Sequence, residues 1–115
     1  MRTVTYKRIS TAHQDIENQS SAIDKQIKLL DWTLVGEYSE IISGTKSRDT
    51  RPELRRLLAD ARKRKFDRVV VYELSRLGRS IVDVINTIHE LEEVGVNIFV
   101  VKNGIDTSTS QGKIF

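Results

Sequence analysis

The sequence predicts one α/β domain of three layers, in which helices flank a central, mainly parallel sheet of four to five strands. Strand and helix patterns alternate along the chain, and short crossovers through helices join parallel neighbours. The run Val69-Val70-Val71 is apolar on both faces, as in a buried parallel strand. With 115 residues, the chain can form one hydrophobic core but not two domains. We therefore expect a single domain over residues 1–115.

The first half of the chain contains two predicted strands with a helix between them. Residues 2–9 and residues 33–38 have strand patterns. Residues 14–31 repeat apolar side chains at helical spacing, which predicts an amphipathic helix. Residues 40–50 are rich in serine, threonine, glycine and charged side chains, so we expect a loop there.

The second half repeats the alternation. A helix begins at Pro52, because proline is tolerated in the first turn of a helix, and residues 67–73 form the next predicted strand. Another helix covers residues 81–94, with Ser80 as the first residue of a capping box. Residues 96–101 form the last predicted strand.

Composition excludes several classes of protein. The content of 38% hydrophobic and 30% charged residues is ordinary for a soluble globular protein. No apolar run approaches the roughly 18 residues that a membrane span needs, and the N-terminus shows no secretory signal, so we expect no membrane partner. The absence of cysteine excludes disulfides and thiolate metal sites and fits a cytoplasmic location.

Positive charge is concentrated in one segment. The net charge is only +3, but residues 51–79 carry ten Lys or Arg against four Asp or Glu. Such a block can bind a polyanion such as nucleic acid. A solvated basic helix surface would give the same count, so charge alone leaves the question open.

Serine and arginine side chains follow three of the predicted strands. They are Arg8 and Ser10 after the first strand, Ser43 and Arg51 after the second, and Arg76 and Arg79 after the third. Sites in open parallel sheets form beyond the carboxyl ends of the strands, so we expect these side chains at one rim. Because Arg76 and Arg79 are three residues apart, we expect them on one side of a helical turn.

These residue types point to phosphoryl chemistry on nucleic acid. The guanidinium group of arginine is a charged, planar fork that matches phosphate oxygens, and a serine hydroxyl is a nucleophile. Each residue also has a simpler reading: Arg8 as a surface strand residue, Ser10 as a helix cap, Arg76 and Arg79 as a solvated face. Their joint placement favours a site.

The same residues resemble the catalytic domain of the serine recombinases, the resolvase/invertase family. The matching motifs run in order from about residue 2 to the C-terminus. They are Tyr6-x-Arg8-x-Ser10, Gln14 and Gln19, Ser43-Gly44, Arg51-Pro52-x-Leu54, Asp67-x-Val69-Val70-Val71, Leu74-x-Arg76-Leu77-x-Arg79-Ser80 and Ile105-Asp106-Thr107-Ser108. The ordered set is far more specific than any one motif, and it implies a resolvase-like fold.

The resemblance implies site-specific DNA strand exchange without a cofactor, metal ion or ATP. Ser10 would attack the scissile phosphodiester to form a 5′-phosphoserine link, while Arg8, Arg76 and Arg79 stabilise the developing charge. The residues expected to assist are Gln19, Ser43, Arg51 and Asp67, and those expected to bind DNA are Arg8, Arg51, Arg76 and Arg79. The implied partners are double-stranded DNA and further copies of the protein, as a dimer and as a tetramer on DNA.

Two departures from the family pattern affect these expectations. Many members have Asp where this chain has Ser75, so a carboxylate often discussed for acid-base chemistry is missing. Members also continue beyond Phe115 into a dimerisation helix and a DNA-recognition domain, so we expect residues 1–115 alone to be inactive. A non-catalytic domain that binds an anion or nucleic acid, or that multimerises, is the alternative. A phosphatase or nuclease would instead pass the phosphoryl group to water.

Overall fold

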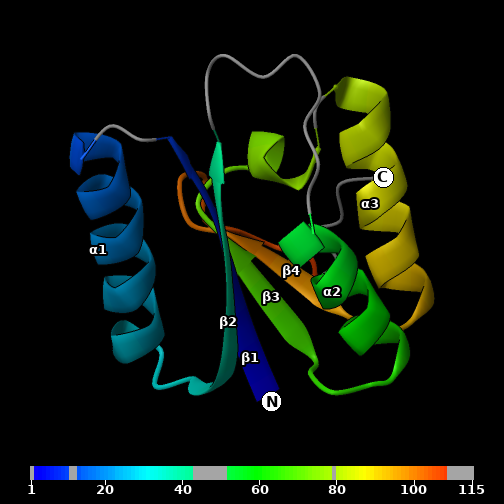
Figure 1. Cartoon of the computed structure of the whole chain (residues 1–115). Coiled ribbons are helices and arrows are strands. Elements are labelled where there is room, and N and C mark those ends of the chain that lie inside the picture. The colour runs from blue at the N-terminus through cyan, green and yellow to red at the C-terminus, as the bar shows by residue number, and fades with distance from the viewer. Residues whose placement is uncertain (1, 11–12, 43–51, 79, 109–115) are drawn as a thin grey trace.

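A five-stranded sheet in the order β2-β1-β3-β4-β5 forms the centre of the molecule (Figure 1). The computed structural model describes residues 2–10, 13–42, 52–78 and 80–108, with the side chains of 9–10, 13–19 and 41–42 left out. The strands are β1 (Arg2–Ser10), β2 (Thr33–Ile42), β3 (Arg68–Val71), β4 (Asn97–Val100) and β5 (Ile105–Asp106). The first four are parallel and β5 is antiparallel to β4, which confirms the predicted mainly parallel sheet.

Helices cover both faces of this sheet and make the predicted three layers. Helix α1 (His13–Leu29) lies on one face, and α2 (Pro52–Arg62) and α3 (Ile81–Glu93) lie on the other (Figure 1). A short 3₁₀ helix, η1 (Leu74–Leu77), follows β3. None of the helices in the described part of the chain is long and apolar enough to cross a membrane.

Alternation along the strands builds an apolar core on each side of the sheet. Val69 and Val71 of β3 belong to the larger cluster with α2 and α3, whereas Val70 packs with Ile23 of α1 and Phe99. All three valines are completely buried. The prediction of a strand that is apolar on both faces is therefore confirmed.

Two local details differ from what the sequence suggests. Strand β2 continues to Ile42, although a loop was expected from residue 40, because β1 and β2 pair along their whole length. The turn after β3 is a 3₁₀ helix that ends at Leu77, and Gly78 is fully extended (φ −169°, ψ 167°). The 3₁₀ turn that carries Arg76 therefore ends before Gly78. The expectation that Arg79 lies on the same side of this turn concerns a residue outside the described set.

The junction between η1 and α3 agrees with the sequence. The Ser80 Oγ accepts a hydrogen bond from the backbone nitrogen of Asp83 at 3.2 Å, as predicted for a capping residue. Gly78 packs closely here, because a Cβ at this position would lie 2.4 Å from the backbone nitrogen of Val84. The chain that carries the site is therefore held tightly against the start of α3.

Candidate active site

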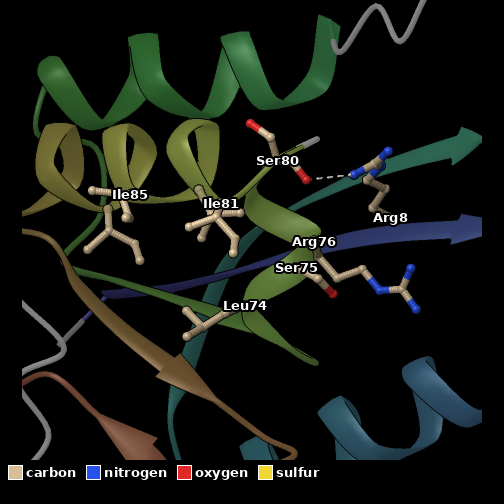
Figure 2. A pocket seen from close by; sticks show the side chains of 10 residues that line it. Arg8, Leu74, Ser75, Arg76, Ser80, Ile81 and Ile85 are labelled. Carbon is tan, nitrogen blue, oxygen red and sulfur yellow. Dashed lines mark hydrogen bonds between the residues drawn. The ribbon is translucent and has the colours of Figure 1, made fainter. Parts of the chain in front are cut away.

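A pocket of about 670 Å³ lies where β1 and η1 meet the start of α3 (Figure 2). Its lining residues are Arg8, Leu74, Ser75, Arg76, Gly78, Ser80, Ile81, Val84, Ile85 and Ile88. Figure 2 shows the guanidinium groups of Arg8 and Arg76 toward one end of the pocket and Leu74, Ile81 and Ile85 toward the other. Two of the arginines predicted from the sequence, which are 68 positions apart, thus line one pocket.

Arg8 ties β1 to the segment that follows η1. Its Nη1 donates a hydrogen bond to the carbonyl oxygen of Gly78 at 3.1 Å, and the contact is partly buried (Figure 2). A guanidinium group that is held by a backbone carbonyl keeps its charge and its direction. It is suited to binding an anion at the rim.

Arg76 is held from its own turn by an acidic residue. The Glu73 Oε1 lies 3.2 Å from the Arg76 Nη2, and both side chains are mostly buried, with 25% and 21% of their surfaces exposed. The other oxygen of Glu73 accepts a hydrogen bond from Lys102 Nζ at 3.1 Å. Sequence reasoning did not single out Glu73, because its partner Lys102 lies 29 residues further along the chain.

Ser10 is the last residue of β1, two positions after Arg8. Its backbone pairs with Ile42 of β2, and its side chain lies outside the described set. The same holds for the side chain of Gln19 in α1. Ser43, Arg51 and Arg79 lie entirely outside the described residues.

Asp67 lies at the opposite edge of the sheet. It contacts Arg2 at the start of β1, with the Asp67 Oδ2 2.9 Å from the Arg2 backbone nitrogen and 3.2 Å from its Nε. Arg2 and Arg8 are six residues apart on one strand, which corresponds to about 20 Å. The structure therefore does not bring Asp67 to Arg8 and Arg76, because it precedes β3 and the starts of parallel strands gather at the other edge.

The contacts of Asp67 change its titration. Hydrogen bonds from the side chain and the backbone of Arg2 lower the pKa of this carboxyl group below its ordinary value. In the middle of β2, burial and the hydrogen bond that the Tyr38 hydroxyl donates to Asp60 at 2.6 Å raise the pKa of Tyr38 to about 12. Both interactions stabilise the layers that carry the pocket and lie outside it.

Glu40 is a further residue that sequence reasoning missed. It is 9% exposed and stands opposite Arg8 in the β1–β2 register. One oxygen accepts a hydrogen bond from the buried Tyr6 hydroxyl at 2.5 Å, and the backbone nitrogens of Glu53 and Leu54 donate to the carboxylate at 3.2 and 3.3 Å. A carboxylate at a helix N-terminus satisfies free N–H groups there, so Glu40 fixes the start of α2 to the strand of Arg8.

The rim also presents the side chain of Ser75. Ser75 lines the pocket and is exposed, so its hydroxyl is accessible beside Arg76. In the part of the chain that the structure describes, no three His, Cys, Asp or Glu side chains gather as metal ligands. Among the described residues that line this pocket, Arg8 and Arg76 carry the positive charge.

Comparisons with known proteins give a consistent result. The family model of the resolvase N-terminal domain matches residues 3–115. The chain is 34% identical over 115 residues to the DNA-invertase hin of Salmonella typhimurium, covering 100% of this chain and 55% of the invertase. It is 35% identical over 116 residues to the serine recombinase gin of Escherichia phage Mu, covering 97% of this chain and 53% of gin. The chain thus spans about half the length of the curated relatives it matches.

Solved structures agree with these relatives. The N-terminal catalytic domain of TP901-1 integrase superposes with a TM-score of 0.83 at 29% identity, covering 100% of this chain and 88% of that one. A resolvase family site-specific recombinase from Streptococcus pneumoniae gives a TM-score of 0.83 at 31% identity, covering 96% and 78%. The fold described above is therefore that of these catalytic domains.

Proposed function

Because the chain belongs to the resolvase N-terminal domain family of the serine recombinases, we propose that it is the catalytic domain of a protein that cleaves and rejoins DNA through a covalent 5′-phosphoserine link on Ser10. The observation that carries this proposal is the convergence of Arg8 and Arg76 in one pocket. They come from two separate segments, and the strand of Arg8 ends at Ser10 two positions later.

Each chemical step has a role for a residue of this chain. The Ser10 oxygen attacks the phosphorus atom, and the bond between phosphorus and the 3′ oxygen breaks. The hydroxyl proton of Ser10 is transferred to the departing 3′ oxygen by way of solvent or a side chain. In the reverse step, a 3′-hydroxyl of the partner strand attacks the phosphoserine and releases Ser10. The energy of the phosphodiester is retained in the covalent link, so the exchange needs no ATP.

The arginines supply the electrostatic stabilisation. Charge on the non-bridging phosphate oxygens grows toward the transition state, and preorganised cations in a partly buried pocket stabilise it strongly. The carbonyl of Gly78 holds Arg8 and the carboxylate of Glu73 holds Arg76, so neither must reorganise when DNA binds. Arg79 would join them, with Gln19, Ser43 and Arg51 assisting. A metal ion is not required in this scheme.

Double-stranded DNA is the proposed substrate, and further copies of the protein are the proposed partners. Exchange of strands requires at least two active sites on each duplex, so the protein would act as a dimer and as a tetramer on DNA. We propose that the recombinase activity belongs to a longer protein, in which a dimerisation helix and a DNA-recognition domain follow this catalytic domain. Residues 1–115 alone would not recombine DNA.

The test is a denaturing-gel assay for a covalent protein–DNA adduct, made with the full-length protein and DNA that flanks its own gene. An adduct on 5′ ends that is sensitive to protease, forms in chelator and disappears in Ser10→Ala is the expected result. Ser21→Ala removes an exposed hydroxyl from α1 and serves as the matched control. Specific binding without any adduct would favour the non-catalytic reading, and free ends that do not rejoin would favour a nuclease.

A further inference from the structure

The Glu73 carboxylate links two cations that come from different parts of the chain. Its Oε1 lies 3.2 Å from the Arg76 Nη2 and its Oε2 lies 3.1 Å from the Lys102 Nζ. Arg76 lines the pocket, whereas Lys102 lies in the turn between β4 and β5. An acidic residue between two cations removes the repulsion that would otherwise push their side chains apart.

The geometry of the 3₁₀ turn aligns Glu73 with Arg76. A 3₁₀ helix has three residues per turn, so side chains at positions i and i+3 lie directly above one another. Glu73 stands at the N-cap of η1, where a carboxylate usually accepts from the backbone. Here its side chain makes no such capping bond, and both of its oxygens contact side chains instead.

Burial makes this ion pair more than a surface contact. The side chains of Arg76 and Glu73 are 21% and 25% exposed, whereas those of the comparable pair between Arg62 and Glu90 are 60% and 44% exposed. Exposed pairs hold a side chain loosely and are screened by salt. A partly buried pair restricts a long arginine side chain, which otherwise has many rotamers.

We infer that Glu73 is a positioning residue for catalysis, which holds the Arg76 guanidinium in the direction needed to bind the scissile phosphate. This inference rests on the proposed function. It also explains how the site works without a carboxylate at Ser75, since the acidic partner of Arg76 comes from three positions upstream. Lys102 supports the arrangement by orienting the same carboxylate from the other side.

Removal of the charge of Glu73 should have opposite effects on DNA binding and on the rate of cleavage. Glu73→Gln makes the pocket more positive, so DNA binding stays equal or becomes tighter. If Glu73 positions Arg76, cleavage nevertheless slows, because a misplaced catalytic group costs about 10-fold or more. Slower cleavage with unweakened binding is an outcome that a change in affinity cannot produce.

The experiment measures single-turnover adduct formation by the full-length protein at saturating DNA, beside the equilibrium affinity for the same DNA. We expect Glu73→Gln to slow adduct formation about 10-fold or more with an unchanged or lower Kd. Glu90→Gln is the matched control. It breaks an exposed ion pair outside the pocket, in which the Glu90 Oε1 lies 2.9 Å from the Arg62 Nη2, and it should leave the rate of adduct formation at the wild-type value. Glutamine keeps the shape of Glu73 and can still accept from Lys102, and a melting curve checks that the fold is retained.

A double-mutant cycle tests whether Glu73 acts through Arg76. In an Arg76→Lys background, Glu73→Gln should slow the reaction by much less than in the wild type, because the group that it positions is gone. Equal rates for Glu73→Gln and Glu90→Gln, or fully multiplicative losses in the cycle, would overturn the inference. Absence of any adduct from the wild-type protein and Glu90→Gln would instead refute the proposed function itself.

Discussion

Replacement of Glu40 with alanine should destabilise the domain strongly, because its buried carboxylate holds three donors. Its carboxylate is the acceptor for the Tyr6 hydroxyl and for the backbone nitrogens of Glu53 and Leu54. Tyr6 is completely buried, and Leu54 is 6% exposed. Glu40→Ala leaves these donors in a place that water reaches poorly, so the loss of each bond costs more than in an exposed site.

The magnitude follows from these three donors. A hydrogen bond to a charged group contributes about 1.5–3 kcal/mol, which we assign to the Tyr6 hydroxyl. Loss of a helix N-terminal acceptor costs about 0.5–2 kcal/mol, which covers the two nitrogens of α2. The sum is about 2–5 kcal/mol. For 115 residues, the free energy of unfolding is roughly 6–17 kcal/mol, so the variant should still fold and be measurable.

Urea unfolding followed by Trp32 fluorescence is the assay. Trp32 is the only tryptophan, and its ring packs edge-on against Phe99 at 5.0 Å, so its emission reports tertiary structure. Glu37→Ala is the matched control in the same strand. Its exposed carboxylate lies 3.9 Å from the Lys7 Nζ, and loss of such a surface pair should change stability by less than about 1 kcal/mol. A Glu40→Ala variant that is as stable as Glu37→Ala would refute the reasoning.

Three further outcomes are expected. Arg76→Lys should reduce adduct formation about 100-fold, since an ammonium group cannot form the bidentate contacts of a guanidinium; near-normal adduct on the denaturing gel would contradict this. Gly78→Ala should lower the free energy of unfolding, measured in urea, by about 1–3 kcal/mol, because the new Cβ would lie 2.4 Å from the Val84 nitrogen. Gly36→Ala is the control and should be near neutral, because its Cβ would lie 3.5 Å from the Val4 Cγ1. Because the pKa of Asp67 is lowered in the folded state, its contribution to the free energy of unfolding is present above the ordinary aspartate pKa of 3.8 and is lost as the pH falls through the folded-state pKa. Asp67→Asn should therefore flatten the acid side of the stability–pH curve. Parallel curves for the variant and the wild type would rule this out.

The fold could be predicted from the sequence because its signals are local and agree with one another. The apolar run of β3, Pro52 at the first position of α2 and the Ser80 cap of α3 each fix one element. The predicted convergence at the carboxyl edge follows from parallel pairing, and the shared pocket of Arg8 and Arg76 agrees with it. None of these conclusions needed side-chain partners from distant segments.

The missed features all depend on such distant partners. The sequence predicts a loop at Glu40, because a carboxylate without partners is unfavourable in a buried strand. In the folded chain, the Tyr6 hydroxyl and the start of α2 donate hydrogen bonds to this carboxylate. Glu73 reads as an ordinary charged residue because Lys102 is far away in sequence. A separation of three residues suits an α-helix and a 3₁₀ helix equally, so the sequence did not reveal that η1 ends before Gly78.

The basic segment 51–79 shows why charge counts say little about a site. Several of its cations are already paired, as Arg56 is with Glu53, Arg62 with Glu90 and Lys65 with Asp60. Arg68 lies over the ring of Trp32 at 4.0 Å, on the α1 face of the sheet. Among the cations of this segment that the structure describes, Arg76 alone lines the pocket. The excess is thus divided between α2, the core and the rim. Position after the end of a parallel strand, and not the number of positive charges, distinguishes Arg76 from the other described cations of the segment.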